Sequence, residues 1–551
     1  MSRWLSMNRS LRLRLPLTQT VAANDSGVSS DSASPKGRGI FGAVASPLEG
    51  EAGRVLFRGR AFAAPKRLRP RRRVRGRFVV PAALLLLLAG CSVGPNYHPP
   101  KTAAPADWSE PQAGGATNSP VEIIQWWKTF QDPELDALID RAVTANHDLR
   151  VAEARLREAR ALRRGAVWDL GPTIEGSAGY TEALRAKNAQ AFTSPTLKLH
   201  TDTYDAHFDA SWEIDIFGGR RRALESVNAE FVAVKEDRRA VLVSVLAEVA
   251  RDYIELRGAQ RRHAIAVKNI QAGAEAVAIA RARFKAGLAG ELDTAQAEAF
   301  EATTQAQLPT LETAWKQAAH RLGVLLGQPP GALLAELTTD APVPKPPPLV
   351  PVGLPSDLLR RRPDVRRAER ELAASTAAIG VETAELFPKF SLIGTAGFQS
   401  LSLSDWFAPG GRYWSAGPTV RWRFLDFGRI RAQVKAATAR QEQALAFYEK
   451  TVLVSFEDVE NALVAYANEQ VRYQALTAAV AANRRALELA NSLYTNGLGQ
   501  FLNVLDAERS LYQAEDQLAD SERSVSQNLV ALYKALGGGW EKETRTKVTT
   551  P

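Results

Sequence analysis

The sequence predicts a mainly α-helical protein that contains two tandem copies of one unit, each with two strands suited to a membrane β-barrel. Three observations lead to this class. Residues recur at a fixed offset of 210 positions, apolar residues follow helical steps of three and four over very long segments, and shorter segments alternate between apolar and polar residues. Together they indicate long helical hairpins joined to a sheet.

The first 90 residues differ from the rest of the chain in charge. Of the 70 Lys and Arg, 17 lie in residues 1–90, together with only 4 of the 60 Asp and Glu, so residues 91–551 hold 53 basic and 56 acidic side chains. The basic character therefore belongs to the leader, and no nucleic acid is expected as a partner.

A lipoprotein signal peptide is predicted over residues 65–90. A basic run (66–77) precedes a 13-residue apolar stretch (78–90), which is too short to cross a bilayer as a helix. The stretch ends in "LAG" before Cys91, the sole cysteine of the chain, so lipid attachment at Cys91 explains this residue better than a disulfide does. The alternative is an ordinary signal followed by a chance cysteine.

The repeat is clearest where "GLAGELDTAQAE" (287–298) aligns with "GLGQFLNVLDAE" (497–508). The same offset continues upstream to Trp212 and Trp422 and downstream to Gly327 and Gly537. Before Trp212 the offset becomes 216, and the change falls in a loop between predicted strands, where length varies at little cost. The chain therefore contains one unit twice.

The repeat also sets the expected boundaries along the chain. In order, we predict a disordered extension or a start codon placed too early (1–64), the lipoprotein signal peptide (65–90), a lipid-anchored N-terminal segment (91–120), repeat 1 (121–328), a Pro-rich extended strap (329–354), repeat 2 (355–540) and a polar tail (541–551).

Each copy is expected to hold the same elements in the same order. Each copy has a first helix, two strands, a very long helix, a glycine turn and a last helix. In the first copy the helices and strands are predicted at 133–168, 173–180, 203–217, 219–286 and 292–327. In the second copy they are predicted at 356–386, 389–398, 412–427, 429–496 and 502–537.

The long helices show coiled-coil spacing, which predicts their partners. Leu242, Leu246, Val249, Tyr253 and Leu256 alternate steps of four and three. A helix of 68 residues extends for about 100 Å, so the two shorter helices of a copy, packed antiparallel, would together cover one long helix. The glycine turns then lie at the far tips of two equivalent helical hairpins.

The second strand of the first copy alternates strictly. In 204–216 the even positions are apolar and the odd positions 205–215 are polar or charged, which fits a sheet with one apolar and one charged face. Its aromatic residues and length suit a transmembrane barrel strand. Four strands cannot close a barrel and an open edge is not viable in lipid, so the chain is expected to oligomerise.

The sequence resembles the outer membrane efflux protein family of TolC-like channels, specifically the lipoprotein branch that serves resistance–nodulation–division pumps. The stretches that carry the resemblance include "CSVGPNYHPP" (91–100), "LPSDLLRRRPDVRRAERELAAS" (354–375), "YTNGLGQFLNVLDAERSLYQAEDQL" (494–518) and "LYKALGGGW" (532–540), and they extend over almost all of residues 91–540. Residues 1–64 depart from the family.

The resemblance implies a fold, a function and a set of partners. The fold would be a homotrimer whose twelve-stranded β-barrel lies in the outer membrane and whose long helices form a periplasmic α-barrel. The function would be a passive exit duct for substrates delivered by an inner-membrane pump and a periplasmic adaptor protein, in a lipid-anchored chain. The resemblance does not name the transported substrate.

The resemblance also assigns site residues. Leu502 and Asp506 would form the periplasmic constriction, while Tyr494 and Arg509 would hold the helix pair closed. The tip residues Gly287, Leu288, Gly497 and Leu498 would contact the adaptor. The first copy has Gln296 and Ala299 where the second has Asp506 and Arg509, so the second hairpin is expected to carry the gate.

Enzymatic chemistry has little support in the sequence. The six His residues include no pair at zinc-helix spacing, and neither a nucleophile-elbow motif nor a phosphate-binding loop occurs. We therefore expect no catalytic residue, metal or cofactor. The competing interpretations are a periplasmic coiled-coil adaptor or structural protein, and the outer membrane channel of a type I secretion system. Two hairpins and four amphipathic strands favour a channel over an adaptor.

Overall fold

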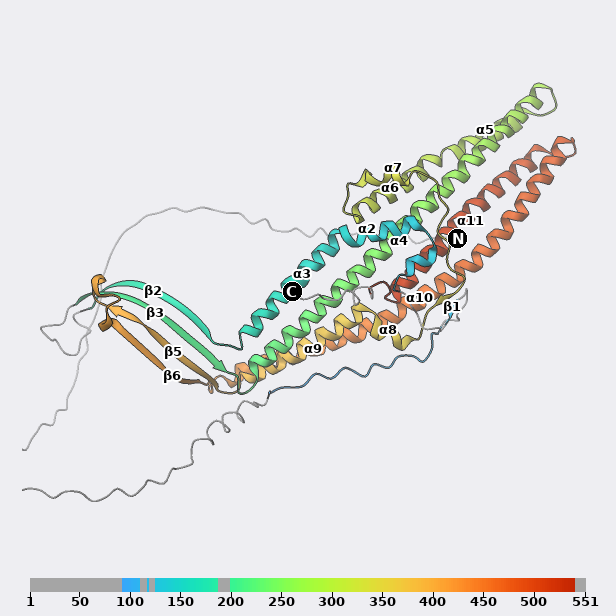
Figure 1. Ribbon diagram of the computed structural model, residues 1–551. Helices are drawn as coiled ribbons and strands as arrows, with labels where there is room; N and C mark the ends of the chain where they lie inside the picture. Colours follow the sequence, from blue (N-terminus) through green and yellow to red (C-terminus); the bar gives the residue numbers. More distant parts are fainter. Residues whose placement is uncertain (1–91, 110–115, 118–123, 187–198, 541–551) are drawn as a thin grey trace, which may run out of the picture. The chain divides into compact units, whose positions relative to one another are not determined.

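The computed structural model describes residues 92–109, 116–117, 124–186 and 199–540. The signal peptide, Cys91, the extension 1–64 and the tail 541–551 lie outside these residues. The first copy comprises η1 (Trp126–Phe130), α2 (Pro133–Ala145), α3 (His147–Trp168), β2 (Thr173–Leu184), β3 (His200–Ile214), α4 (Gly219–Lys285), α5 (Glu291–Gln305) and α6 (Leu308–Leu325) (Figure 1).

The second copy repeats this order with small differences. It comprises α8 (Pro355–Arg361), α9 (Pro363–Ala384), β5 (Lys389–Ser400), η4 (Leu403–Asp405), η5 (Pro409–Gly411), β6 (Arg412–Arg421), α10 (Phe427–Thr495) and α11 (Phe501–Ala535). The predicted element order is confirmed in both copies. The strand predicted to reach residue 427 ends at Arg421, and α10 begins at Phe427.

Three of the predicted helices are interrupted, and each break has a local cause. The helix predicted over 133–168 divides at Asn146, whose side chain accepts from the backbone N–H groups of Asp148 and Leu149 at 2.9 and 3.1 Å. Pro363 begins α9 and ends the helix before it at Arg361. Pro309 lies at the start of α6, where the second copy has Ala519, and α11 is therefore unbroken.

The segment between the copies is only partly extended. It begins with two short helices, η3 (Pro330–Leu333) and α7 (Leu334–Leu337), which the predicted strap lacked. Leu333 and Leu337 are fully buried, so these turns pack on the core. Further on, β4 (Val350–Pro351) pairs in parallel with β1 (Ala116–Thr117), so the N-terminal segment and the strap are tied together.

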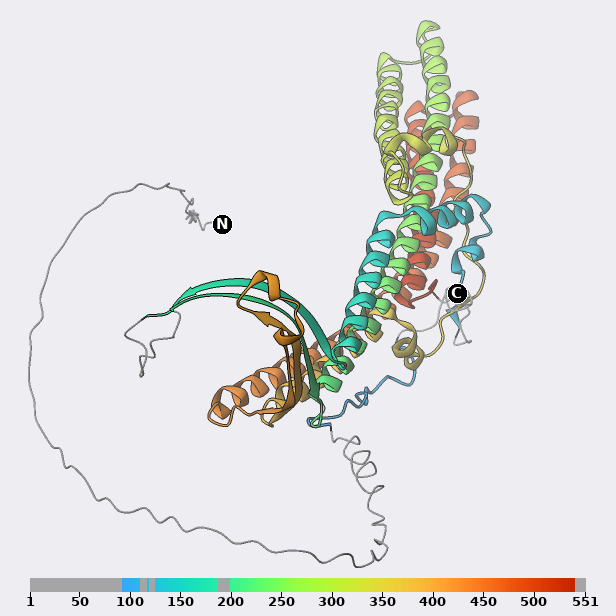
Figure 2. The same ribbon diagram turned by 60° about the vertical axis from the view of Figure 1, so that its left-hand side comes forward.

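The long helices are covered in the predicted antiparallel manner. Arg163 of α3 donates to Asn228 of α4 at 2.6 Å, and Arg281 near the far end of α4 pairs with Glu298 of α5 at 2.6 Å. α9 and α11 each pack against both α4 and α10, so the second copy also covers the first (Figures 1 and 2). Among the described residues, no helix is long and apolar enough to cross a membrane.

The largest apolar core joins the beginning of the first copy to the end of the second. Trp126 is stacked on Tyr533 with ring centroids 5.3 Å apart, and both are almost fully buried. Tyr253 of α4 and Leu529 of α11 lie in the same cluster. Arg257 is also buried and is paired with Glu134, with a further hydrogen bond to the Thr339 carbonyl at 2.7 Å. One core therefore holds both copies.

The four strands form one antiparallel sheet in the order β2-β3-β5-β6. Figures 1 and 2 show the strands side by side, strongly curved along their length. Glu175, Asp209 and Thr395 lie in one row across three strands. Among the residues that the structure describes, β2 and β6 are the edges, and the sheet is not closed.

Candidate functional site

The two glycine turns close the hairpins with the same hydrogen bonds. Gly287 has φ 73° and Gly497 has φ 74°, a left-handed conformation that glycine adopts without a steric cost. In each turn the backbone N–H of the next leucine donates to the carbonyl five positions earlier. Leu288 donates to the Arg283 carbonyl at 2.8 Å, and Leu498 donates to the Leu493 carbonyl at 2.9 Å. Leu288 and Leu498 are 69% and 78% exposed, so both tips present a leucine to the surroundings.

A small apolar cluster, which we call the tip core, joins the two hairpins just below these turns. Its members come from four helices: Ala276, Val277 and Ala280 of α4, Ala297 of α5, Tyr494 of α10, and Phe501, Val504 and Leu505 of α11. The tip core is separate from the main core. The ends of the hairpins are therefore held to one another by few apolar side chains.

Arg283 of the first hairpin holds Tyr494 of the second. Its guanidinium carbon lies 4.3 Å from the centroid of the Tyr494 ring, and its Nη1 donates to the Tyr494 carbonyl at 3.0 Å. Burial raises the pKa of the Tyr494 hydroxyl, which remains neutral beside the cation. A cation over a desolvated ring contributes roughly 2 kcal/mol, so this contact is a substantial part of the tip interface.

Arg509, which the resemblance assigns with Tyr494 to holding the helix pair closed, contacts a different ring. Its guanidinium carbon is 5.7 Å from the centroid of the Phe300 ring, on the first hairpin. The sequence did contain a signal for Arg283 instead. The first copy reads "RARFK" over 281–285 where the second reads "NSLYT" over 491–495, so the basic residues of this turn belong to one copy only.

Leu502 and Asp506 lie outside the tip core. They are one helical turn apart on α11, Leu502 is 42% exposed, and Asp506 is also exposed. Within the described chain, Asp506 makes no ion pair with Arg509. The first-copy counterparts Leu292 and Gln296 lie in a similar place on α5, with Leu292 67% exposed. Leu502, Asp506 and Leu292 therefore face away from the protomer's own packing, whereas Gln296 is half-buried.

The tip contact leaves polar atoms unsatisfied. Arg283 Nε, Thr294 Oγ1, Tyr494 Oη and Glu508 Oε2 are buried and have no hydrogen-bond partner among the described residues. Each such atom costs free energy, because it has lost water and gained no partner. The arrangement at the tip is consequently stabilised less than the same area of an apolar core.

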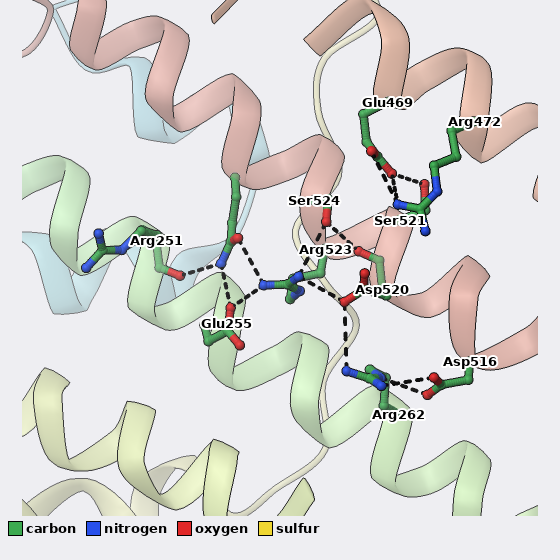
Figure 3. A network of polar contacts seen from close by, with 11 residues as sticks. Arg251, Glu255, Arg262, Glu469, Arg472, Asp516, Asp520, Ser521, Arg523 and Ser524 are labelled. Carbon is green, nitrogen blue, oxygen red and sulfur yellow. Dashed lines mark hydrogen bonds and ion pairs between the residues drawn. The ribbon is translucent and has the colours of Figure 1, made fainter. Parts of the chain in front are cut away.

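A polar network fastens α11 to α4 farther from the tip (Figure 3). Arg262 of α4 donates to both oxygens of Asp516 at 2.7 and 2.9 Å, and Arg523 of α11 bridges Asp520, at 2.9 Å, and Glu255 of α4. Gly258 makes this possible, since a Cβ there would lie 2.6 Å from Arg523 Cδ.

This network has no counterpart in the first copy. The positions equivalent to Asp516, Asp520 and Arg523 are Ala306, Thr310 and Thr313, which cannot form the same ion pairs. Asp516, Asp520 and Arg523 therefore fix this part of α11 to α4, while nearer the tip α11 is held by the tip core and by smaller apolar contacts of Leu511 and Tyr512.

Glu182, His200 and Asp202 come within ligand distance of one another where β2 ends and β3 begins, but Glu182 and His200 are exposed and, among the described residues, nothing else at this place points to an ion. Carboxylates and imidazoles on a surface commonly lie this close without a metal.

Comparisons with known proteins place this arrangement in a family. The family model described as "Outer membrane efflux protein" matches residues 138–328 and 354–538, one match for each copy. The chain belongs to the outer membrane efflux protein family. Members of this family are efflux channels of the outer membrane and not enzymes.

Individual members of this family are similar over nearly their whole length. The pyoverdine export outer membrane protein OpmQ of Pseudomonas putida is 35% identical over 472 residues, which are 85% of this chain and 98% of that protein. Nodulation protein T of Rhizobium leguminosarum bv. trifolii is 33% identical over 465 residues, 83% of this chain and 96% of that protein. The solved outer-membrane channel OprN has a TM-score of 0.76 and 39% identity, covering 82% of this chain and all of that one.

Replacing Arg283 with Ala is predicted to loosen the tip. The change removes both the ring contact and the hydrogen bond to Tyr494, together worth roughly 1–3 kcal/mol. Amide hydrogen exchange in the segment 491–505 should become at least several-fold faster. Arg281→Ala is the matched control, since it removes an exposed ion pair within one hairpin, worth about 0–1 kcal/mol. Equal exchange in the two variants would contradict the assignment.

Proposed function

We propose that three copies of this chain form an outer membrane channel, the passive exit duct of a tripartite efflux pump. The single observation that carries the proposal is the open four-stranded sheet with edges at β2 and β6. Unpaired backbone groups at a sheet edge are too costly in lipid, and the smallest membrane barrels have about eight strands. Three copies supply twelve strands, with each β2 edge paired to a neighbour's β6 edge.

The two faces of the sheet support a barrel around water. The even-numbered face exposes large apolar side chains, among them Ile174 (69%), Phe208 (67%), Trp414 (78%) and Val420 (60%). An apolar face this large needs a covering, and acyl chains provide one.

The opposite face of the sheet is polar and internally bonded. His207 lies between Asp205 and Asp209, with its Nε2 2.9 Å from an Asp209 oxygen. Tyr413 donates to Asp205 at 3.0 Å, and Thr395 donates to Asp209. Charged groups in this position are costly against lipid and inexpensive in a water-filled lumen.

Thiol labelling is predicted to distinguish the two faces. Both variants keep Cys91. The new thiol of Asp209→Cys should react with a water-soluble thiol reagent, because residue 209 is proposed to face water. The new thiol of Phe208→Cys should not react, because residue 208 is proposed to face lipid. The reaction is measured on the protein in membranes. Equal labelling, or the reverse order, would exclude this barrel orientation.

The gate of the duct is proposed at Leu502 and Asp506. In a trimer each protomer would direct this exposed pair of α11 towards the threefold axis, so that three leucines and three carboxylates narrow one ring. Like charges around a ring repel one another, which makes the closed ring easy to open. The tip contacts of Tyr494 with Arg283 and of Arg509 with Phe300 would hold each α11 in place.

The combined Leu502→Ala and Asp506→Ala variant is predicted to widen the duct. Single-channel conductance in planar bilayers should rise, and cells should become more sensitive to large antibiotics. The matched variant Leu292→Ala with Gln296→Ala changes the equivalent place on α5 and should have much less effect. An equally large rise in that variant would refute a gate confined to the second copy.

The exposed tips would contact the adaptor. Gly287 and Gly497 shape the turns, and Leu288 and Leu498 offer apolar side chains that a partner helix could cover. An inner-membrane pump would supply the cargo through this adaptor. The pyoverdine export named for the P. putida relative supports small organic molecules as the cargo class.

Lipid attachment at Cys91 is supported by the position of the next residues. Val93 donates its backbone N–H to the Phe217 carbonyl at 3.0 Å, and Ser92 packs so closely on Gly218 that a Cβ there would lie 2.5 Å from the Ser92 hydroxyl. Phe217 and Gly218 link β3 to α4, where the strands meet the helices. An acyl chain on Cys91 would therefore begin beside the proposed barrel end.

Mass spectrometry of the mature protein is predicted to find a diacylated or triacylated Cys91 at the N-terminus. Cys91→Ser should abolish the lipid while the barrel still assembles, because one anchor adds membrane affinity and not barrel stability. An intact peptide across Gly90 and Cys91 as the main species would contradict this prediction.

A further inference from the structure

A carboxyl group occupies the apolar seam between the tip core and the polar network. α11 buries Phe501, Val504, Leu505, Leu511 and Tyr512. Glu508 lies three or four residues from each of the last four, so helical spacing places it in the middle of this stripe. Its neighbours along the stripe are apolar or aromatic, and Glu508 is the residue that departs from the pattern.

In the described part of the chain, no hydrogen bond or ion pair stabilises a charge on Glu508. Its Oε2 atom is buried without a hydrogen-bond partner among the described residues. Burial raises the pKa of the Glu508 carboxyl to about 7. An ionised carboxylate without a partner is costly away from water, so the packed position favours the neutral acid.

The charged groups on the surrounding helices do not compensate Glu508. The ion pairs Arg262–Asp516 and Arg484–Glu515 fix how α4 and α10 lie along α11. The charged residues of these stretches are Lys268 and Glu275 on α4, Glu301 on α5, Arg484, Arg485 and Glu488 on α10, and Asp506 and Arg509 on α11. Within the described chain, none of them forms an ion pair with Glu508. All except Glu301 are exposed to solvent.

In the first copy, the glutamate at the equivalent position is ion-paired with an arginine. Glu298 is the counterpart of Glu508, and it is exposed and paired with Arg281 through two hydrogen bonds of 2.9 and 2.6 Å. In the second copy Asn491 takes the place of Arg281. The second hairpin therefore has the acid without its base, and that hairpin also carries Leu502 and Asp506.

We propose that Glu508 is a proton-binding residue that positions the tip of α11, packed when the carboxyl is neutral and released towards water when it ionises. The proposal rests on the proposed function, in which this tip carries the gate. The polar network of Figure 3 holds α11 from Asp516 onward, so release is confined to the turns between Phe501 and Asp516. Loss of the packed tip would move Leu502 and Asp506.

The direction of the pH dependence follows from linkage. The packed state has a pKa of about 7, above the 4.5 of an exposed glutamate, so the packed state binds the proton more tightly. Protonation favours the packed tip fully below about pH 4.5, and this contribution is lost as pH rises through about 7. From pH 6 to pH 8 the ratio of packed to released tip should fall about tenfold in each protomer.

Planar-bilayer recordings at pH 6 and pH 8 test the proposal with two matched variants. Wild-type channels should conduct more at pH 8 than at pH 6. Glu508→Gln keeps the shape of the neutral acid, so its conductance should remain at the pH 6 level. Glu298→Gln should retain the wild-type response. The proposal is overturned if Glu508→Gln keeps the wild-type pH response, or if wild-type channels form and conduct equally at pH 6 and pH 8.

A spectroscopic measurement separates this proposal from the proposed function. An infrared titration of detergent-solubilised protein should show a protonated-carboxyl band that disappears near pH 7 in the wild type and is missing in Glu508→Gln. If the wild-type chain forms no channels, the proposed function is wrong. The carboxyl band of Glu508 would still support the proton site in that case. Identical carboxyl titrations in wild type and variant would overturn the proton site whatever the conductance.

Discussion

A helix about 100 Å long with an apolar seam must be covered along its whole length, and this constraint shapes the rest of the chain. α4 and α10 have 67 and 69 residues. Each turns back through a glycine at one end and meets a strand at the other, so shorter helices from both directions can lie along it. The two copies then cover one another, with α9 and α11 packed against both long helices.

The sequence was sufficient for the order of the main elements and for the antiparallel covering of the long helices, because both follow from periodicity. That the helices of one copy also pack on the long helix of the other was not predicted. Steps of three and four predict the long helices, and the strict alternation of 204–216 predicts a strand. The positions at which helices are interrupted were harder to predict from the sequence. Asn146 caps a second helix by accepting hydrogen bonds from two backbone N–H groups. Periodicity alone does not show whether an asparagine will cap a new helix or lie within a continuous one. The two short helices at the start of the strap were missed because a proline-rich composition favours extended chain.

For the candidate residues at the tip, the sequence could predict which side chains share a face only where they lie on one helix. Leu502 and Asp506 are one turn apart on α11, so their shared face follows from spacing. Arg283 and Tyr494 meet across two hairpins, and no local pattern brings them together. What the sequence did offer was a departure from the repeat, since Arg281, Arg283 and Lys285 correspond to Asn491, Leu493 and Thr495. In a duplicated chain, positions where the copies differ in charge deserve the first inspection.

The core around Trp126 and Tyr533 has a consequence for how the chain is made. These two residues stack although they lie at opposite ends of the described sequence, and Ser109 likewise bonds Glu460, 351 positions away. Closing such large loops carries a high entropic cost, and contacts between distant residues slow folding. The main core that contains residues of α2 and α4 is completed only by α11, the last helix of the described residues. A newly made chain therefore needs protection from aggregation until α11 has been synthesised.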